Sequence, residues 1–84
     1  MQITFKLFAT LTDYLPPEAR RSNLTTLDVA PDASIAQIIA PFGLPEKLVH
    51  LVLLNGSYIA PEDRMTKTLV DGDVLAIWPP IAGG

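Results

Sequence analysis

The last seven residues of the sequence read Trp-Pro-Pro-Ile-Ala-Gly-Gly and have the clearest potential for chemistry. Gly83 and Gly84 have no side chains, so this end can enter a narrow active-site channel and approach a nucleotide closely. Pro79 and Pro80 cannot continue a sheet ladder through their nitrogens, and they favour an extended polyproline conformation. These residue types predict a tail over 79–84 that presents the carboxyl group of Gly84 for reaction. The alternative is an ordinary frayed end, since chain termini are often poorly ordered.

Upstream of this tail the sequence has no legible catalytic pattern. The carboxylates are scattered, and there is no Ser/His/Asp arrangement and no glycine-rich phosphate loop. The chain has no cysteine and a single histidine, His50, so neither a thiolate site nor a histidine cluster is available for a metal. The run Asp71-Gly72-Asp73 lacks the rest of a calcium loop and is interpreted as a turn.

These absences lead to three expectations. The chain is expected to bind no metal and no cofactor of its own and to catalyse no reaction by itself, so it is not expected to be an enzyme. His50 is interpreted as a packing or surface residue. Arg64 and Lys67 are interpreted as solvated loop charges, although contact with a partner is an alternative.

Composition and charge limit the class of protein. With 84 residues, 49% apolar and 18% charged, the chain is expected to form one small folded domain rather than a disordered segment. The net charge of −3 and the absence of any Lys/Arg run longer than Arg20-Arg21 argue against nucleic-acid binding. We see no signal peptide and no apolar run near 18 residues, so we expect a cytoplasmic protein without a membrane span.

The hydrophobic pattern predicts five strands and one main helix. Ser34 and Gln37 form a capping-box pattern at the start of the helix, and Gly43 provides its end. Pro41 is expected to tighten or kink the last helical turn. Period-two alternation, apolar content and the Asn55-Gly56 turn place the strands. The expected strands cover residues 2–8, 24–29, 49–54, 57–59 and 74–78.

The resulting order, β-β-α-β-β-β, indicates an α+β domain in which one helix packs across one face of a sheet. We expect this domain to span residues 1–78 and the flexible tail to span 79–84. There are no internal repeats and no interdomain linker.

The C-terminal segment 69–84, with its Leu-Val-Asp-Gly-Asp turn and Trp-Pro-Pro-Ile-Ala-Gly-Gly end, resembles the C-terminal signature of the MoaD/ThiS family of sulfur carriers. The segments 6–9 and 52–56 and the helix after Ser34 fit other landmarks of that family. The Pro-Pro pair favours the molybdopterin synthase small-subunit branch over the thiamine branch. The stretch 43–48 departs from the family, in which a longer helical region is expected.

The resemblance implies a ubiquitin-like β-grasp fold, with a mixed sheet whose first and last strands pair in parallel at its centre. It also implies a mechanism. An E1-like adenylating enzyme of the MoeB/ThiF type would use ATP and magnesium to adenylate Gly84. A persulfide from a sulfurtransferase or cysteine desulfurase would then give a thiocarboxylate (1-thioglycine) at Gly84.

For the molybdopterin branch, the resemblance implies that the tail enters the synthase large subunit. Its sulfur then builds the dithiolene of molybdenum cofactor. The tail residues expected to occupy the partner's channel are Pro79, Pro80, Ile81, Ala82 and Gly83.

The resemblance also implies which face of the sheet is buried. Leu75 and Ile77 are expected to face the helix, which leaves Phe8 and Trp78 on the outer face near the tail. Exposed aromatics beside a reactive end suggest a partner-binding site, with an ordinary core role for Trp78 as the alternative. Two other functions stay open: sulfur transfer for thiamine or another metabolite, and protein modification through an isopeptide bond from Gly84 to lysine.

Overall fold

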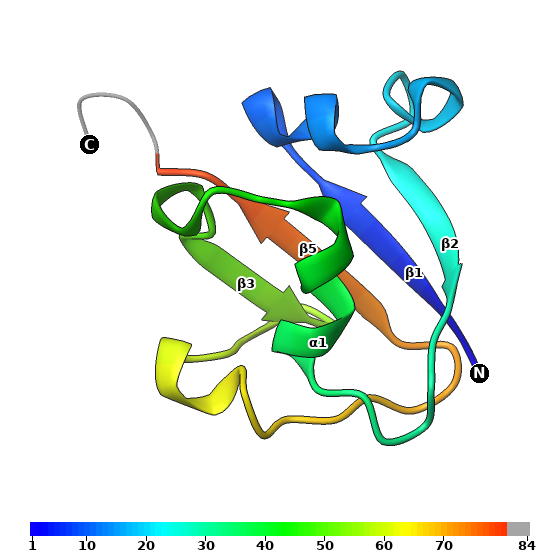
Figure 1. Cartoon of the computed structure of the whole chain (residues 1–84), viewed down its shortest axis with the longest axis vertical. Coiled ribbons are helices and arrows are strands. Elements are labelled where there is room, and N and C mark those ends of the chain that lie inside the picture. The colour runs from blue at the N-terminus through cyan, green and yellow to red at the C-terminus, as the bar shows by residue number, and fades with distance from the viewer. Residues whose placement is uncertain (81–84) are drawn as a thin grey trace.

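The computed structural model describes residues 1–80, and a five-stranded mixed sheet forms its centre (Figure 1). The order across the sheet is β2-β1-β5-β3-β4. The five expected strands are confirmed, with small differences at their ends. Their bounds are β1 (Gln2–Leu7), β2 (Leu24–Asp28), β3 (Leu51–Leu54), β4 (Ser57–Tyr58) and β5 (Val74–Trp78).

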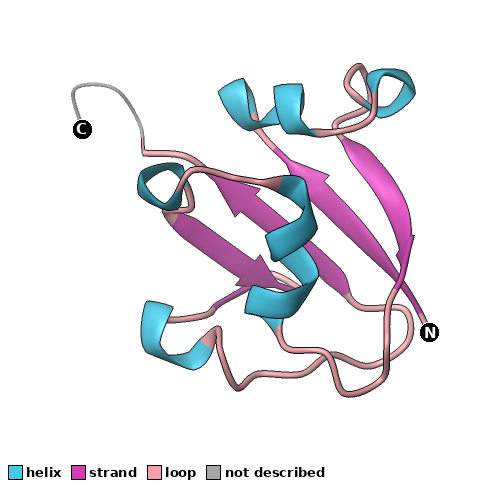
Figure 2. Cartoon of the chain, in the orientation of Figure 1, coloured by secondary structure: helices cyan, strands magenta, loops and turns pink. Residues whose placement is uncertain are grey.

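Strands β1 and β5 are parallel neighbours at the centre of the sheet, as expected. Phe5 lies beside Leu75 and Leu7 beside Ile77, so the two strands run in register toward the same end. The other neighbours are antiparallel: β2 pairs with β1, and β3 pairs with both β5 and β4. This arrangement confirms the expected β-grasp fold. Figure 2 shows the strands running side by side with the main helix across them.

Helix α1 (Ile35–Ile39) begins with the predicted capping box. The amide of Gln37 donates to Oγ of Ser34 (3.2 Å), and the amide of Ser34 donates to Oε1 of Gln37 (2.9 Å). The α-helix ends before Gly43 because Pro41 lacks the amide that would extend it, and residues Ala40–Phe42 form a tighter 3₁₀ turn, η3, as expected from Pro41. Gly43 follows at φ 66°, a left-handed conformation that favours glycine, and ends the segment.

The core lies between α1 and the inner face of the sheet. Phe5, Ile77 and Ile35 are fully buried there, and the Phe5 ring packs 4.6 Å from that of Phe42, measured between ring centroids. The segment after β1 forms a 3₁₀ helix, η1 (Ala9–Tyr14), which adds Leu11 to the same core. A second 3₁₀ turn, η2 (Pro17–Ala19), follows it before β2 begins. The remaining inner-face residues of the core are Ile3, Leu7, Val52, Leu54 and Leu75.

Strand β3 begins at Leu51 rather than at the expected residue 49. A 3₁₀ turn, η4 (Glu46–Leu48), precedes it, and Val49 caps that turn with ψ 79°, outside the extended region. A further 3₁₀ turn, η5 (Pro61–Asp63), follows β4. In residues 1–80, none of the helices is long and apolar enough to span a bilayer.

Candidate functional site

Strand β5 brings Trp78 to the edge of the domain from which the tail departs. The amide of His50 donates to the Trp78 carbonyl (3.2 Å), and the amide of Phe8 donates to the Ile77 carbonyl (3.2 Å). The last two residues of β5 are thus held from its two sides, Trp78 by the segment before β3 and Ile77 by the residue after β1. In Figure 1 the chain leaves this end of β5 away from the helix. The structure therefore fixes the point from which the tail starts.

Phe8 and Trp78, predicted from the sequence as a partner-binding pair, lie against one another. Their ring centroids are 3.9 Å apart and their planes differ by 2°, so the rings are stacked. Each side chain is half-buried. The expectation that Trp78 is substantially exposed is wrong, because one face of its indole ring is covered by Phe8. The expectation that Leu75 and Ile77 point into the core is confirmed, since both are fully buried.

The aromatic pair belongs to a larger apolar surface on the outer face of the sheet. The β3–β5 register sets Leu51 beside Trp78 and Leu53 beside Ala76, and both leucines are half-buried. Tyr58 of β4 lies opposite Leu53 and is 56% exposed. Ala76 shares this face but is buried, because Lys6 and Leu53 flank its small side chain. This outer face therefore consists of partly accessible apolar residues that extend from the start of the tail.

The tail itself lies largely beyond the described residues. Pro79 is buried and Pro80 is exposed. The predicted channel residues Ile81, Ala82 and Gly83, and the predicted reacting residue Gly84, are outside the described residues.

Arg64 contradicts its interpretation as a solvated loop charge. It is only 9% exposed, and its guanidinium donates to three backbone carbonyls: Nε to Ile59 (3.3 Å), Nη1 to Val49 (3.2 Å) and Nη2 to His50 (3.2 Å). A planar guanidinium has five donors in a fixed fork, which suits several carbonyls at once. Arg64 thus fixes the segment just before β3, from which the His50 amide reaches Trp78. Lys67, the other basic residue of this loop, is exposed as expected.

The turn at Asp71 and Asp73 uses its carboxylates for structure. Asp73 is 8% exposed, and it accepts hydrogen bonds from Nδ2 of Asn55 (2.9 Å) and from the amide of Val70 (2.9 Å). Asp71 accepts from the amide of Gln2 (2.7 Å). The interpretation of 71–73 as a turn is confirmed. Across residues 1–80, no group of three or more His, Asp or Glu side chains is arranged to hold a metal ion.

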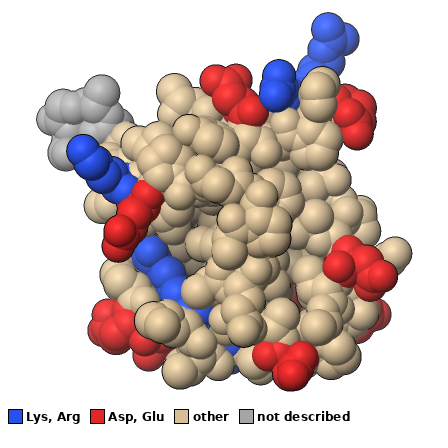
Figure 3. All heavy atoms as spheres, viewed as in Figure 1, with Lys and Arg blue, Asp and Glu red and all other residues tan. Residues whose placement is uncertain are grey.

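The charged side chains are dispersed. Figure 3 shows acidic and basic groups spread around the rim of the helix-bearing face, with uncharged side chains between them. His50 is exposed, in agreement with its interpretation as a surface residue.

The sequence prediction missed Leu51, Leu53 and Tyr58 as members of the outer face. For the two leucines the sequence contains a signal, because successive side chains of a strand point to opposite faces. Once one residue of 51–54 is known to be buried, the faces of the other three follow. Arg64 has no such signal, since its neighbours in sequence are polar or exposed and its carbonyl partners lie in other segments.

A mixed five-stranded sheet with parallel first and last strands and one capped helix on one face defines a ubiquitin-like protein. The sequence profile of the Mut7-C ubiquitin family matches residues 1–82. The chain therefore belongs to this family, and its resemblance to the ubiquitin-like carriers of the MoaD/ThiS kind is confirmed. A comparison with curated protein sequences finds no match.

Solved structures extend this result. The solution structure of the Haloferax volcanii HVO 2177 protein is 27% identical, covers 100% of this chain and 87% of its own, and gives a TM-score of 0.74. The crystal structure of SAMP1 from Haloferax volcanii is 25% identical over 100% of both chains, with a TM-score of 0.67. One chain of a complex of subunits 1 and 2 of molybdopterin-converting factor from Helicobacter pylori has the same fold. It is 21% identical to this protein over 100% of each of the two matched chains, with a TM-score of 0.61.

Proposed function

We propose that this protein is a sulfur carrier whose terminal residue, Gly84, is adenylated and then converted to a thiocarboxylate. The observation that carries the proposal is the way in which the central strand β5 ends. The carbonyls of Ile77 and Trp78 accept hydrogen bonds from the segments on either side of β5, and the Trp78 ring stacks on Phe8. A Pro-Pro pair and, at the end, two glycines follow in the sequence. A rigid base with a narrow, side-chain-poor end is what a covalent carrier needs to reach into a partner's active site.

The chemistry requires partners, because a carboxylate is a poor electrophile. In the activating enzyme, a Gly84 carboxylate oxygen attacks the α-phosphate of ATP, and pyrophosphate leaves. A persulfide sulfur then attacks the acyl carbon, and AMP leaves. A second thiol cleaves the sulfur–sulfur bond, which leaves the thiocarboxylate on Gly84 and a disulfide on the donor. ATP and magnesium belong to the activating partner, and this chain supplies the substrate carboxyl group.

The acceptor that we propose is the large subunit of a molybdopterin synthase. The Helicobacter pylori complex contains two subunits of a molybdopterin-converting factor, and one of them has the fold of this chain over its full length. In such an assembly the outer face of the sheet beside the tail would contact the large subunit. Half-buried Trp78, Phe8 and Leu51 are suitable anchors, because large apolar side chains at the centre of an interface carry most of its binding energy.

A test of this proposal uses two variants of Gly84, one that lacks it and one with an alanine appended after it. Each is incubated with activating enzyme, ATP, sulfur donor and synthase large subunit, and the dithiolene product is measured. Both variants should give no product and should unfold at the temperature of the wild type, since a tail adds little burial. Product from either variant would contradict the proposal.

The second candidate function is protein modification. SAMP1 from Haloferax volcanii is 25% identical to this chain, and another matching structure from that organism is titled small archaeal modifier protein 1. Modification uses the same adenylate, but a lysine amine attacks in place of sulfur. Mass spectrometry of lysines that carry the tryptic remnant of residues 68–84, the fragment left after cleavage at Lys67, separates the two in cells with and without Gly84. Remnants that depend on Gly84, without dithiolene synthesis, would favour the modifier.

A further inference from the structure

Strand β2 forms one edge of the sheet, and its backbone groups alternate in direction. Met1 and Val29 exchange two backbone hydrogen bonds, with N···O distances of 2.9 and 2.8 Å. Because bonded pairs alternate along an antiparallel ladder, the N–H and C=O groups of Thr26 and Asp28 point away from β1. Within residues 1–80, neither residue's backbone groups have a hydrogen-bond partner. The edge therefore offers two donors and two acceptors with the spacing of a strand.

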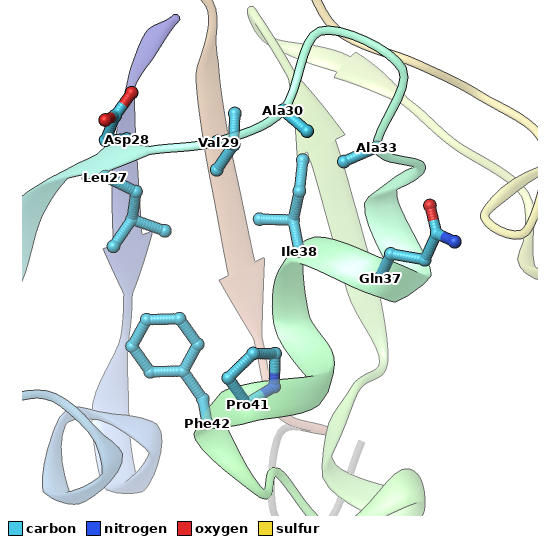
Figure 4. A pocket seen from close by; sticks show the side chains of 9 residues that line it. All are labelled: Leu27, Asp28, Val29, Ala30, Ala33, Gln37, Ile38, Pro41 and Phe42. Atoms are coloured by element: carbon cyan, nitrogen blue, oxygen red, sulfur yellow. The ribbon is translucent and has the colours of Figure 1, made fainter.

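A groove of about 320 Å³ lies beside this edge, between β2 and the helical segment (Figure 4). Leu27 and Val29 form one wall, and Ile38, Pro41 and Phe42 form the other. Figure 4 shows the Leu27 side chain directed toward Phe42, on the helix side of the sheet, whereas the Asp28 carboxylate points away from the helix. Leu27, Val29 and Phe42 are only half-buried, so the groove has apolar walls that water still reaches.

The edge has few of the features that usually protect a free strand. Proteins discourage edge pairing with prolines, charged side chains (above all lysine), bulges or very short strands, and β2 has a single charge, Asp28. The opposite edge follows this rule, because β4 has only two residues. Strand β2 has five residues, Leu-Thr-Thr-Leu-Asp, with neither proline nor lysine among them. An extended chain can therefore pair along the whole of β2.

The charges near the groove favour a basic partner. Asp28 has a side chain that is 85% exposed, and its contact with the amino group of Met1 (3.3 Å) leaves most of the carboxylate accessible. Asp32 is also exposed and follows four residues later. A second copy of the chain does not fit the groove, because the inward-facing Leu27 of that copy already packs against its own core.

We propose that the open edge of β2 and the adjoining groove bind an extended segment of another protein, which adds to the sheet as an antiparallel strand. Main-chain hydrogen bonds to Thr26 and Asp28 supply affinity. A branched aliphatic side chain of the segment fills the groove between Leu27 and Phe42, and a basic side chain lies near Asp28. Strand β1 separates β2 from β5, and the groove residues of β2 lie beside the start of β1, whereas the tail departs beside the end of β1.

The first test uses a labelled nine-residue peptide with alternating isoleucine and threonine and a lysine near its N-terminus. Fluorescence anisotropy should show saturable binding to the full chain. N-methylation of the threonines, whose amides would face β2 in an antiparallel pair, should weaken binding by about tenfold or more. N-methylation of the isoleucines should have little effect. Absence of binding, or equal effects of the two patterns, would overturn strand addition.

The second test changes the edge itself. Thr26→Pro removes an outward amide that the ladder does not use, and an edge strand tolerates proline at such a position. It should weaken peptide binding by about tenfold, whereas the matched control Thr26→Val should keep it. The melting temperature and the sulfur loading of Gly84 should be unchanged in both, which separates this inference from the proposed function.

If Thr26→Pro unfolds the chain, a charge swap replaces it. Asp28→Lys should weaken binding of the lysine peptide and restore binding of a peptide with glutamate at that position. No recovery, unchanged binding to Asp28→Lys, or a peptide-induced dimer seen by light scattering would overturn the proposal.

Discussion

The two ends of strand β5 are held in different ways. At Val74 the chain is fixed by polar contacts around the buried Asp73: Asn55 donates to the Asp73 carboxylate (2.9 Å) and accepts from the Val74 amide through Oδ1 (2.8 Å). At Trp78 the side chain is held by a ring stack on Phe8. The Val74 end of β5 is therefore held by hydrogen bonds to a buried carboxylate. The Trp78 end is held by packing of a partly exposed ring.

This difference predicts which end serves the fold and which serves the partner. A buried carboxylate with donors on both oxygens is costly to disturb, because its removal leaves those donors unpaired. Truncation of a half-buried aromatic side chain costs little free energy of folding. Burial of the same side chain under a partner contributes much free energy of binding. Variants at the two ends should therefore separate stability from transfer.

The largest effect is expected in the tail, with Gly83→Val. A β-branched side chain restricts the backbone and crowds a channel built for glycine. The rate of sulfur loading should fall on the order of 100-fold or more, the scale of a misplaced reacting group. Single-turnover loading assays measure the rate, and calorimetry should find the same melting temperature as for the wild type. Loading at the wild-type rate would show that the channel does not require glycine here.

The next effect is expected at the other end of β5. Asp73→Ala leaves the Asn55 amide and the Val70 amide without their acceptor and should lower the free energy of unfolding by about 2–3 kcal/mol. Urea denaturation measures this value. At a temperature at which the variant is folded, sulfur loading should be near that of the wild type. A stable Asp73→Ala protein with defective loading would reverse the roles assigned to the two ends.

Trp78→Ala should affect binding more than folding. It should weaken the complex with the synthase large subunit by about 2 kcal/mol, roughly 30-fold, as for an interface anchor. Isothermal titration calorimetry gives the affinity. Tyr58→Ala, on the same face but farther from the tail, is the matched control and should cost less. If the two variants weaken binding equally, or if Trp78→Ala leaves it unchanged, the aromatic pair is not the anchor.

The smallest effect is expected for Pro80→Ala. Pro80 is exposed, and its ring limits the backbone freedom of the tail. Alanine should raise the free-energy cost of ordering the tail in the channel by about 0.4–1 kcal/mol. This corresponds to roughly a two- to fivefold rise in the KM of the activating enzyme for the carrier. Steady-state kinetics with carrier as the varied substrate measure this. A lower KM would mean that stiffness hinders entry.

The fold was largely predictable, because its signals are local or periodic. Asn55 and Gly56 both have positive φ (51° and 85°), as an Asn-Gly hairpin turn requires. The capping box at Ser34 was also visible from residue types alone. The parallel pairing of β1 and β5 joins segments about seventy residues apart, so periodicity alone could not reveal it, and the family resemblance was needed.

The site was less predictable, because it depends on contacts between distant segments. The stack of Phe8 on Trp78 follows from the β1–β5 register, which the sequence does not encode locally. Arg64 is the clearest example. A charged residue in a polar loop is normally solvated, yet here three backbone carbonyls from two other segments enclose the guanidinium. Its burial depends on tertiary structure that no pattern within the loop expresses.

The central claim is that Gly84 carries activated sulfur, and the intact mass of the protein tests it most directly. Wild-type chain, activating enzyme, ATP and a persulfide donor are incubated together, and matched samples omit ATP or lack Gly84. The account predicts a gain of about 16 Da, the exchange of one oxygen for sulfur, only in the complete sample with the wild-type chain. An unchanged mass with an enzyme shown to be active, or the same gain in the chain without Gly84, would contradict it.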